Sequence, residues 1–180
     1  MRRAIVGPMW PRQTLFTDER MGEQLWTALD RLPRGSAVVF RHKSLSPAER
    51  ERLARAIART CFRRGLKLAV AGDAALARRV DADMIHKPDG LTRGLPFSLP
   101  VHDEIEALEA RRRGASLVYV SPVFSTRSHP DVPALGPERA LHLARLATCP
   151  AIALGGMDAR RYAMLNRSHF IGWAGIDAFL

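Results

Sequence analysis

Residues 37–70 read AVVFRHKSLSPAERERLARAIARTCFRRGLKLAV and contain one complete strand–helix–strand unit. The apolar runs 37–40 and 66–70 have the length and composition of buried strands. Between them, residues 46–49 form a capping box with proline at the first helical position. Apolar residues then recur at helical spacing from Leu53 to Cys61, which predicts a helix that packs on the two strands.

The same alternation extends in both directions along the chain. Short apolar runs followed by helix-like segments are typical of βα units and a parallel sheet. Eight such runs predict one closed (β/α)8 barrel, the TIM-barrel fold, which carries its chemistry in the loops after the strands. The expected strands are residues 15–17, 37–40, 66–70, 83–85, 97–99, 117–120, 151–154 and 170–174.

The chain has 180 residues, whereas this fold usually takes roughly 200 or more. We therefore expect a single α/β domain over residues 1–180 in which some helices are shortened or missing. The Pro/Gly-rich segment 87–96 is predicted to lack a proper helix, and residues 1–13 are predicted to form an irregular arm. Helices are expected near residues 23–32, 47–64, 73–79, 103–113 and 137–149, and from residue 158 onward.

The formal net charge is +10, from 28 Lys and Arg against 18 Asp and Glu. A basic chain can bind nucleic acid, but the arginines here are scattered over the predicted helices, with few aromatic residues for base stacking. We interpret them mainly as solvated helix faces, so nucleic-acid binding is not favoured. A positive potential would still attract phosphorylated small molecules.

No apolar run approaches the roughly 20 residues of a membrane span, and no signal-peptide core follows the basic N-terminus. These observations favour a cytoplasmic protein without a membrane segment. Cys61 and Cys149 have neither metal-binding nor redox spacing, and we interpret both as buried packing residues.

Charged residues follow the second and third predicted strands, where a barrel carries its site. Arg41 and Lys43 are separated by one residue, so they would point the same way and could clamp an anion. The alternative is a solvated strand end. Asp73 could hold Mg²⁺ through its carboxylate, or it could cap a short helix, which is the commoner role for such a residue.

Histidines follow the fourth and fifth predicted strands, at His86 and His102. Imidazole titrates near neutral pH, so either residue is a candidate general acid or base. A lone histidine is more often structural, and His102 together with Asp103 also begins a helix, so a capping role competes.

The longest loop, residues 121–136, follows the sixth predicted strand and contains Thr126, Ser128 and His129. It could close over a substrate as a lid. The alternative is a surface excursion, although loops of this length in compact domains are usually functional.

Two glycines, Gly155 and Gly156, follow the seventh predicted strand and would let the backbone approach an anion closely. Gly175 and Ile176, at the end of the eighth strand, would form the other half of the same site. Phosphate sites of such barrels frequently lie after strands 7 and 8, so the sequence predicts a phosphate-binding site here.

Five segments, in this order, resemble the thiamine-phosphate synthase family, which includes the related thiazole tautomerases. Residues 39–45 resemble its Q-x-R-x-K-x-L motif, and Gly72-Asp73 with Ala77 resembles N-D-x-x-x-A. The remaining segments are 82–86, which resemble A-D-G-x-H, 119–126, which resemble a loop ending in P-x-F-x-T, and 150–157, which resemble P-x-x-A-I-G-G-I. The resemblance runs from about residue 15 to the C-terminus and implies the (β/α)8 fold.

The synthase of that family joins an aminopyrimidine diphosphate to a thiazole phosphate and releases pyrophosphate with the help of Mg²⁺. The resemblance assigns diphosphate-binding cations (Arg41, Lys43), a Mg²⁺ ligand (Asp73) and thiazole-phosphate positions (Thr126, Gly155, Gly156). The tautomerase branch shifts a proton on a thiazole phosphate carboxylate. Its histidine matches His102, the expected general base and acid.

The chain departs from the family pattern at several positions. The second Mg²⁺ carboxylate falls at Leu91, and Asp89 could replace it only through a rearranged loop. Losing a carboxylate weakens a magnesium site that uses few protein ligands. The other replacements are Val39 for glutamine, Gly72 for asparagine, Pro100 for serine, His129 for lysine and Asp177 for serine.

The sequence therefore predicts an enzyme of thiamine biosynthesis that acts on a thiazole phosphate, either by synthase coupling or by tautomerase-like proton transfer. The surviving residues fit the proton transfer better, although synthases also resemble this sequence at His102. The alternative is a non-catalytic descendant that binds a phosphorylated ligand or a partner protein, motivated by Asp177 and the missing carboxylate. A homodimer is expected because a shortened ring of helices leaves apolar barrel surface to cover.

Overall fold

The computed structural model describes residues 11–127, 131–165 and 168–180. In these ranges eight strands close into one barrel in chain order, as predicted. All neighbouring strands are parallel, and the ring closes where β1 pairs with β8, with Thr14 opposite Ala174. The strands are β1 (Gln13–Phe16), β2 (Ala37–Phe40), β3 (Lys67–Ala71), β4 (Met84–His86), β5 (Phe97–Val101), β6 (Leu117–Val120), β7 (Ala151–Leu154) and β8 (Phe170–Gly175).

Six α-helices surround the barrel within the described residues, each close to its predicted position. They are α1 (Gln24–Arg31), α2 (Pro47–Arg64), α3 (Ala74–Arg79), α4 (Glu104–Arg112), α5 (Gly136–Ala147) and α6 (Ala159–Ala163), with the short 3₁₀ helices η1 (Glu19–Met21) and η2 (Asp177–Phe179). No helix lies between β4 and β5, as predicted for residues 87–96. The shortened outer layer explains how 180 residues complete this fold.

The predicted boundary of the irregular arm, residues 1–13, is wrong at its last residue. Gln13 already belongs to β1, where it pairs with Trp173 of β8. A boundary error of this size is expected, because Gln13 is a polar residue at the start of a short strand. Residues 1–10 lie outside the described residues.

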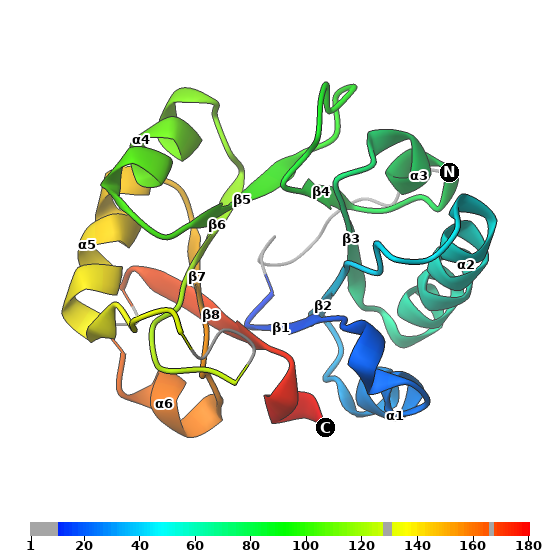
Figure 1. Cartoon of the computed structure of the whole chain (residues 1–180), viewed down its shortest axis with the longest axis horizontal. Helices are drawn as coiled ribbons and strands as arrows, with labels where there is room; N and C mark the ends of the chain where they lie inside the picture. The colour runs from blue at the N-terminus through cyan, green and yellow to red at the C-terminus, as the bar shows by residue number, and fades with distance from the viewer. Residues whose placement is uncertain (1–10, 128–130, 166–167) are drawn as a thin grey trace.

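Figure 1 shows α1 to α3 along one side of the ring of strands and α4 to α6 along the other. Among the described residues, the stretch of chain between α3 and α4 holds β4, β5 and their connection and no helix. The protein is thus a single α/β domain whose central barrel is complete and whose outer layer is not.

The best-marked helix of the sequence, α2, begins and ends as predicted. The Ser46 side chain accepts a hydrogen bond from the Glu49 N–H, and the Glu49 carboxylate accepts one from the Ser46 N–H, which completes the capping box. Gly65 ends the helix at a φ of 66°, in the left-handed region that glycine tolerates best. Strand β3 can therefore begin two residues later.

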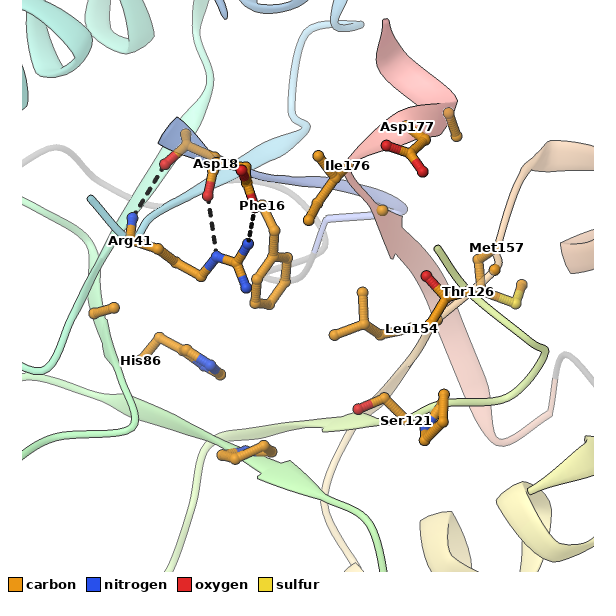
Figure 2. A pocket seen from close by; sticks show the side chains of 18 of the residues that line it. Phe16, Asp18, Arg41, His86, Ser121, Thr126, Leu154, Met157, Ile176 and Asp177 are labelled. Atoms are coloured by element: carbon orange, nitrogen blue, oxygen red, sulfur yellow. Dashed lines mark hydrogen bonds and ion pairs between the residues drawn. The ribbon is translucent and has the colours of Figure 1, made fainter. Parts of the chain in front are cut away.

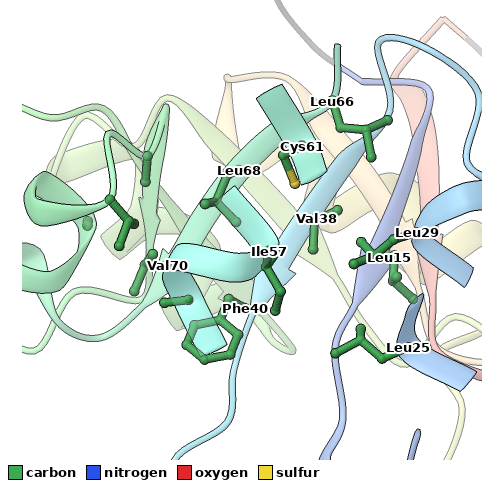
Figure 3. Close-up of a cluster of buried hydrophobic side chains, with 14 of the residues drawn as sticks. Leu15, Leu25, Leu29, Val38, Phe40, Ile57, Cys61, Leu66, Leu68 and Val70 are labelled. Atoms are coloured by element: carbon green, nitrogen blue, oxygen red, sulfur yellow. The ribbon is translucent and has the colours of Figure 1, made fainter. Parts of the chain in front are cut away.

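Alternation along the strands divides the core into an inner and an outer layer. Val39 of β2 points into the barrel, where eight buried residues pack together: Phe16, Val39, Ala69, Met84, Leu117, Tyr119, Ile152 and Ala174. Its neighbours Val38 and Phe40 point outward and pack against helices. Figure 3 shows this outer layer, in which Ile57 and Cys61 of α2 meet residues of β1 to β3.

Two exposed apolar residues, Ile105 and Leu108, lie on α4, the helix that follows the connection without a helix. The homodimer predicted from the shortened outer layer stays a prediction. Among the described residues, no helix combines the length and the apolar content needed to cross a membrane.

Candidate active site

The C-terminal ends of the strands surround a cavity of about 690 Å³, part of which Figure 2 shows. Parallel strands of a closed barrel all end at the same face, so residues far apart in the chain meet there. The predicted site residues that line this cavity are Arg41, Lys43, His86, His102, Thr126, Gly155, Gly156, Gly175 and Ile176.

Arg41, the first residue after β2, is held against the end of β1. Its Nε donates to the carbonyl oxygen of Thr17 at 3.0 Å, and its Nη2 lies 3.1 Å from Asp18 Oδ2. Its Cζ also lies 5.5 Å from the centre of the Phe16 ring. Figure 2 shows the guanidinium over that ring. Arg41 is therefore a preoriented cation in the cavity wall.

Asp18 is a carboxylate shared by two guanidinium groups. Arg20 Nε donates to its Oδ1 at 2.7 Å, and Arg41 contacts its Oδ2. The hydrogen bond from the Arg20 side chain is the main cause that lowers the pKa of Asp18 to about 2, while burial acts in the opposite direction. One negative charge thus faces two positive ones, and the cluster keeps a net positive charge toward an anionic ligand.

The next residues, His42 and Lys43, lie in different environments. His42 is buried, its Nδ1 lies 3.1 Å from Thr17 Oγ1, and burial lowers its pKa. Lys43 is exposed and lines both the cavity and a second, smaller hollow. Of the two cations of the predicted anion clamp, Arg41 is fixed by Asp18 and Lys43 extends toward solvent.

The second hollow, which we call the side hollow, has a volume of about 340 Å³. It is lined by Lys43, Leu45, Pro47, Arg50, Ala71, Asp73, Leu76, Arg79 and Asp89. Asp73 lines the side hollow and is not among the residues around the main cavity. Its Oδ1 accepts from the Leu76 N–H at 2.8 Å, so it caps α3, and its Oδ2 lies 3.6 Å from Arg50 Nη1. The structure therefore shows the capping role.

Asp89 brings a second carboxylate to the side hollow. Its side chain occupies the space that a Cβ at position 72 would need, and its N–H donates to the Gly72 carbonyl oxygen at 3.1 Å. Gly72 thus makes room for Asp89, whereas the family pattern has an asparagine at that position. Leu91, at the position of the family's second carboxylate, is 86% exposed.

These two carboxylates bear on whether the site fits Mg²⁺. Within the described residues, no group of three or more His, Cys, Asp or Glu side chains is arranged to hold a metal ion. Mg²⁺ is usually bound through one or two carboxylates together with substrate phosphates and water. Asp73 and Asp89, which both line the side hollow, offer oxygen ligands of the kind that such a site uses.

His86 lies where the barrel interior meets the cavity. Its Nδ1 is 3.0 Å from Ser98 Oγ, and its ring packs edge-on against Phe16 and Tyr119. Burial lowers the pKa of His86 to about 3, so the ring is neutral at physiological pH. A neutral imidazole can form a hydrogen bond with a ligand, but a general base works best when its pKa is near the operating pH.

His102 is placed differently, at the half-exposed rim of the cavity. Its Nδ1 lies 2.6 Å from Oε2 of Glu106, and the same oxygen accepts from the His102 backbone N–H at 2.7 Å. The Glu106 carboxylate thereby fixes both the backbone and the ring. Of the two histidines that the sequence proposes, His102 has the geometry of an acid–base group.

Gly155 and Gly156 bring the end of β7 close to the loop after β6. A Cβ on Gly155, whose φ is 88°, would lie 2.6 Å from Pro122 Cα. A Cβ on Gly156, whose φ is 59°, would collide with the Ser125 carbonyl oxygen. Neither N–H donates a hydrogen bond to another described residue. These two amides are thus available to an anion in the cavity.

The loop after β6 is pinned at its base and covers part of the cavity. The N–H groups of Leu135 and Gly136 donate to the carbonyl oxygens of Pro122 and Val123 at 2.8 and 3.0 Å. From this loop, Thr126 and Val132 line the cavity. The two remaining predicted loop residues, Ser128 and His129, lie outside the described residues, and their roles stay predictions.

Asp177, which stands where the family has a serine, also lines the cavity next to Ile176. Its Oδ2 accepts from Arg127 Nε at 3.1 Å, so its charge is paired with a cation from the loop after β6. This pair reduces the repulsion that a free carboxylate would exert on a phosphate.

The sequence reasoning missed the two carboxylates that hold predicted site residues: Asp18, which holds Arg41, and Glu106, which holds His102. A signal existed for Glu106, because a glutamate three residues after a predicted N-cap, here Asp103, tends to reach back past the start of its helix. No local signal indicated Asp18, since its contact with Arg41 joins residues that are 23 positions apart.

These features define a (β/α)8-barrel protein with a cavity, lined by cationic side chains and glycine backbone, at the C-terminal face of the barrel. A sequence profile described as thiamine monophosphate synthase matches residues 14–90 and 91–179. The chain therefore belongs to the thiamine-phosphate synthase family, which confirms the resemblance of its motifs.

Individual relatives agree with this assignment. A provisionally named thiamine-phosphate synthase 2 of Aquifex aeolicus is 26% identical, over 94% of this chain and 98% of its own length. The thiamine-phosphate synthase of Chloroflexus aurantiacus is 30% identical, over 80% of this chain and 72% of its own. Among solved structures, a thiamine phosphate pyrophosphorylase from Pyrococcus furiosus has the same fold, with a TM-score of 0.80, 22% identity and coverage of 93% and 86% of the two chains.

Because Gly155 lies so close to Pro122, alanine should destabilise the protein more at position 155 than at position 35. Gly155→Ala and Gly35→Ala both place alanine at a positive φ, 88° and 85°, but only Gly155 has neighbouring atoms within 4 Å. Overpacking costs about 1–3 kcal/mol, so urea unfolding should show Gly155→Ala to be less stable than Gly35→Ala by that amount. Equal losses of unfolding free energy in the two variants would contradict this prediction, because they would show that Pro122 moves away from the added methyl group at little cost.

Because His86 is buried in its neutral form, the folded protein should lose stability as the pH falls. Its pKa is about 3 in the folded protein against an ordinary value of 6.5, so its contribution is complete above pH 6.5 and is lost as the pH falls toward 3. His86→Gln should reduce the slope of unfolding free energy against pH in this window by up to about 1.4 kcal/mol per pH unit. An unchanged slope in His86→Gln would contradict the assignment.

Proposed function

We propose that this protein is an enzyme of thiamine biosynthesis that binds a thiazole phosphate and moves a proton on it. Its family acts on phosphorylated thiamine precursors. The observation that carries the proposal is the His102–Glu106 contact of 2.6 Å at the cavity rim. It leaves the second ring nitrogen of His102 available as a base in a cavity that also offers backbone amides to a phosphate.

The phosphate would bind where β7 and β8 end. Gly155 and Gly156 supply N–H groups that no described residue accepts, and Gly175 and Ile176 line the cavity at the end of β8, the strand next to β7. Thr126 adds a hydroxyl from the loop after β6. Backbone amides suit a phosphate well because they donate hydrogen bonds without bringing flexible side chains.

The substrate carboxylate would face Arg41. A guanidinium can donate two parallel hydrogen bonds to a carboxylate, and Arg41 is already oriented by Thr17 and Asp18. Holding the substrate at both its phosphate and its carboxylate would orient the thiazole ring between them. Such orientation supplies part of the rate enhancement before any proton moves.

The proton transfer itself would be carried out by His102. The imidazole removes a proton from one position of the thiazole phosphate carboxylate, and the electron pair of the broken bond shifts within the substrate. The imidazolium then returns the proton to another position, so the reaction is an isomerisation that neither gains nor loses atoms. The Glu106 carboxylate stabilises the imidazolium that forms between the two steps.

A second candidate is the synthase reaction, which the side hollow supports. Lys43, Arg50 and Arg79 offer cations to a diphosphate, and Asp73 and Asp89 would hold Mg²⁺ beside it. Bound Mg²⁺ would supply charge neutralisation for the departing pyrophosphate. Asp89 would take the place of the family's second carboxylate, with Gly72 providing the space.

The proton-transfer proposal predicts a specific effect of His102→Asn. The asparagine amide stands where Nδ1–H stood and can still donate to Glu106, so the variant removes the Nε2 function alone. Thiazole isomerisation followed by NMR should fall about 10²–10⁴-fold in kcat. His142→Asn, at an exposed position of α5, should retain full activity.

Absence of isomerisation by the wild-type protein would contradict this proposal. A rise in melting temperature with thiazole phosphate would then favour a non-catalytic binding protein, because ligand binding to the native state stabilises it.

The synthase candidate predicts pyrophosphate release from an aminopyrimidine diphosphate and a thiazole phosphate in the presence of Mg²⁺. If Asp89 holds the ion, Asp89→Asn should slow the release and raise the Mg²⁺ concentration needed for half-maximal rate. Asp81→Asn, an exposed residue just after α3, should change neither. No release at high enzyme concentration would remove this candidate.

A further inference from the structure

Glu106, the third residue of α4, lies outside the five segments that resemble the family's motifs, and it contacts His102 at two points. Its Oε2 accepts from the backbone N–H of His102 at 2.7 Å and lies 2.6 Å from His102 Nδ1. The start of α4 holds this glutamate in place, because its own N–H donates to Asp103 Oδ1 at 2.8 Å.

We propose that Glu106 is the positioning residue of His102, which it fixes in the Nδ1–H tautomer so that the Nε2 lone pair is offered to the cavity. The catalytic meaning of this inference rests on the proposed function. The tautomer itself is a property of the free protein, so it can be measured without a substrate.

The tautomer follows from the chemistry of the two partners. An ionised carboxylate only accepts hydrogen bonds, so the contact between Glu106 and a neutral imidazole requires the hydrogen on Nδ1. A neutral imidazole carries one N–H, which leaves the lone pair on Nε2. Since His102 lines the cavity, that lone pair can accept a proton from a ligand bound there.

Helix capping alone does not account for the arrangement. The N-terminus of α4 is already capped by Asp103. In a capping box, the glutamate at the third position reaches the N–H of the capping residue itself. Glu106 instead reaches one residue further back, to the backbone and the ring of His102.

The same helix turn offers a matched control. Glu104, the first residue of α4, carries the same charge but pairs with Arg139 of α5 at 3.4 Å. Neutralising Glu104 or Glu106 removes one negative charge from the first turn of the helix, so both variants change the interaction with the helix dipole alike. Only a substitution of Glu106 should affect the His102 imidazole.

The direct test is nitrogen-15 NMR of the histidine rings in the ligand-free protein at about pH 8.5, above the ordinary histidine pKa of about 6.5. The His102 signals are those lost in His102→Asn. We expect the Nδ1–H tautomer in the wild type and in Glu104→Gln, and a shift toward Nε2–H in Glu106→Ala. Glu106→Gln should keep Nδ1–H, because its carbonyl oxygen still accepts the hydrogen bond.

Kinetics give a second readout. Glu106→Ala should lower the kcat of thiazole isomerisation by about 10–100-fold with little change in KM, the usual effect of losing a partner that orients an active group. Glu106→Gln should recover part of this loss, and Glu104→Gln should behave as the wild type does.

The inference is overturned if the wild-type ring carries its hydrogen on Nε2, or if Glu106→Ala leaves the tautomer unchanged. A result in which the tautomers follow the expectation but the wild type isomerises no thiazole phosphate supports the positioning of His102 by Glu106. That same result would contradict the proposed function, so the two failures are distinguishable.

Discussion

The closed ring of parallel hydrogen bonds is the constraint on which the rest of this structure depends. Its last link pairs β1 with β8, the first strand with the last, and so brings Leu15 opposite Gly175. Closure places the C-terminal ends of all eight strands at one face, and side chains that follow different strands, such as Arg41 and His102, share one cavity. The chain can therefore lose a helix between β4 and β5 without losing the site, because the outer layer supports the barrel but does not close it.

Charge compensation is the second theme of the site. Asp18 holds Arg41, Glu106 holds His102 and Arg127 pairs with Asp177. In each pair, one partner orients a side chain at the cavity and partly neutralises the charge of that side chain. The surplus remains positive around Arg41, where Arg20 shares the same carboxylate. An anionic substrate would thus meet cations and amides that are already in place, so little reorganisation is needed on binding.

The sequence carried enough information for the barrel and for part of the cavity lining. Apolar runs located all eight strands, and the caps at Ser46, Asp103 and Asp158 located the helices, because these signals are local. Contacts between segments that are far apart in the chain could not be predicted from the sequence. Nothing local ties Asp18 to Arg41, and the position of Asp89 over Gly72 depends on the path of a loop without regular structure. For Asp73, the motif alone could not distinguish a metal ligand from a helix cap. In the structure its carboxylate caps α3 and also faces Arg50 in the side hollow.

The most direct test of the account is a crystal structure of the protein with thiazole phosphate bound. The account predicts the phosphate within hydrogen-bonding distance of the Gly155 and Gly156 amides, with the thiazole ring between Arg41 and His102. A ligand seated instead in the side hollow, or one whose ring lies out of reach of His102, would contradict it.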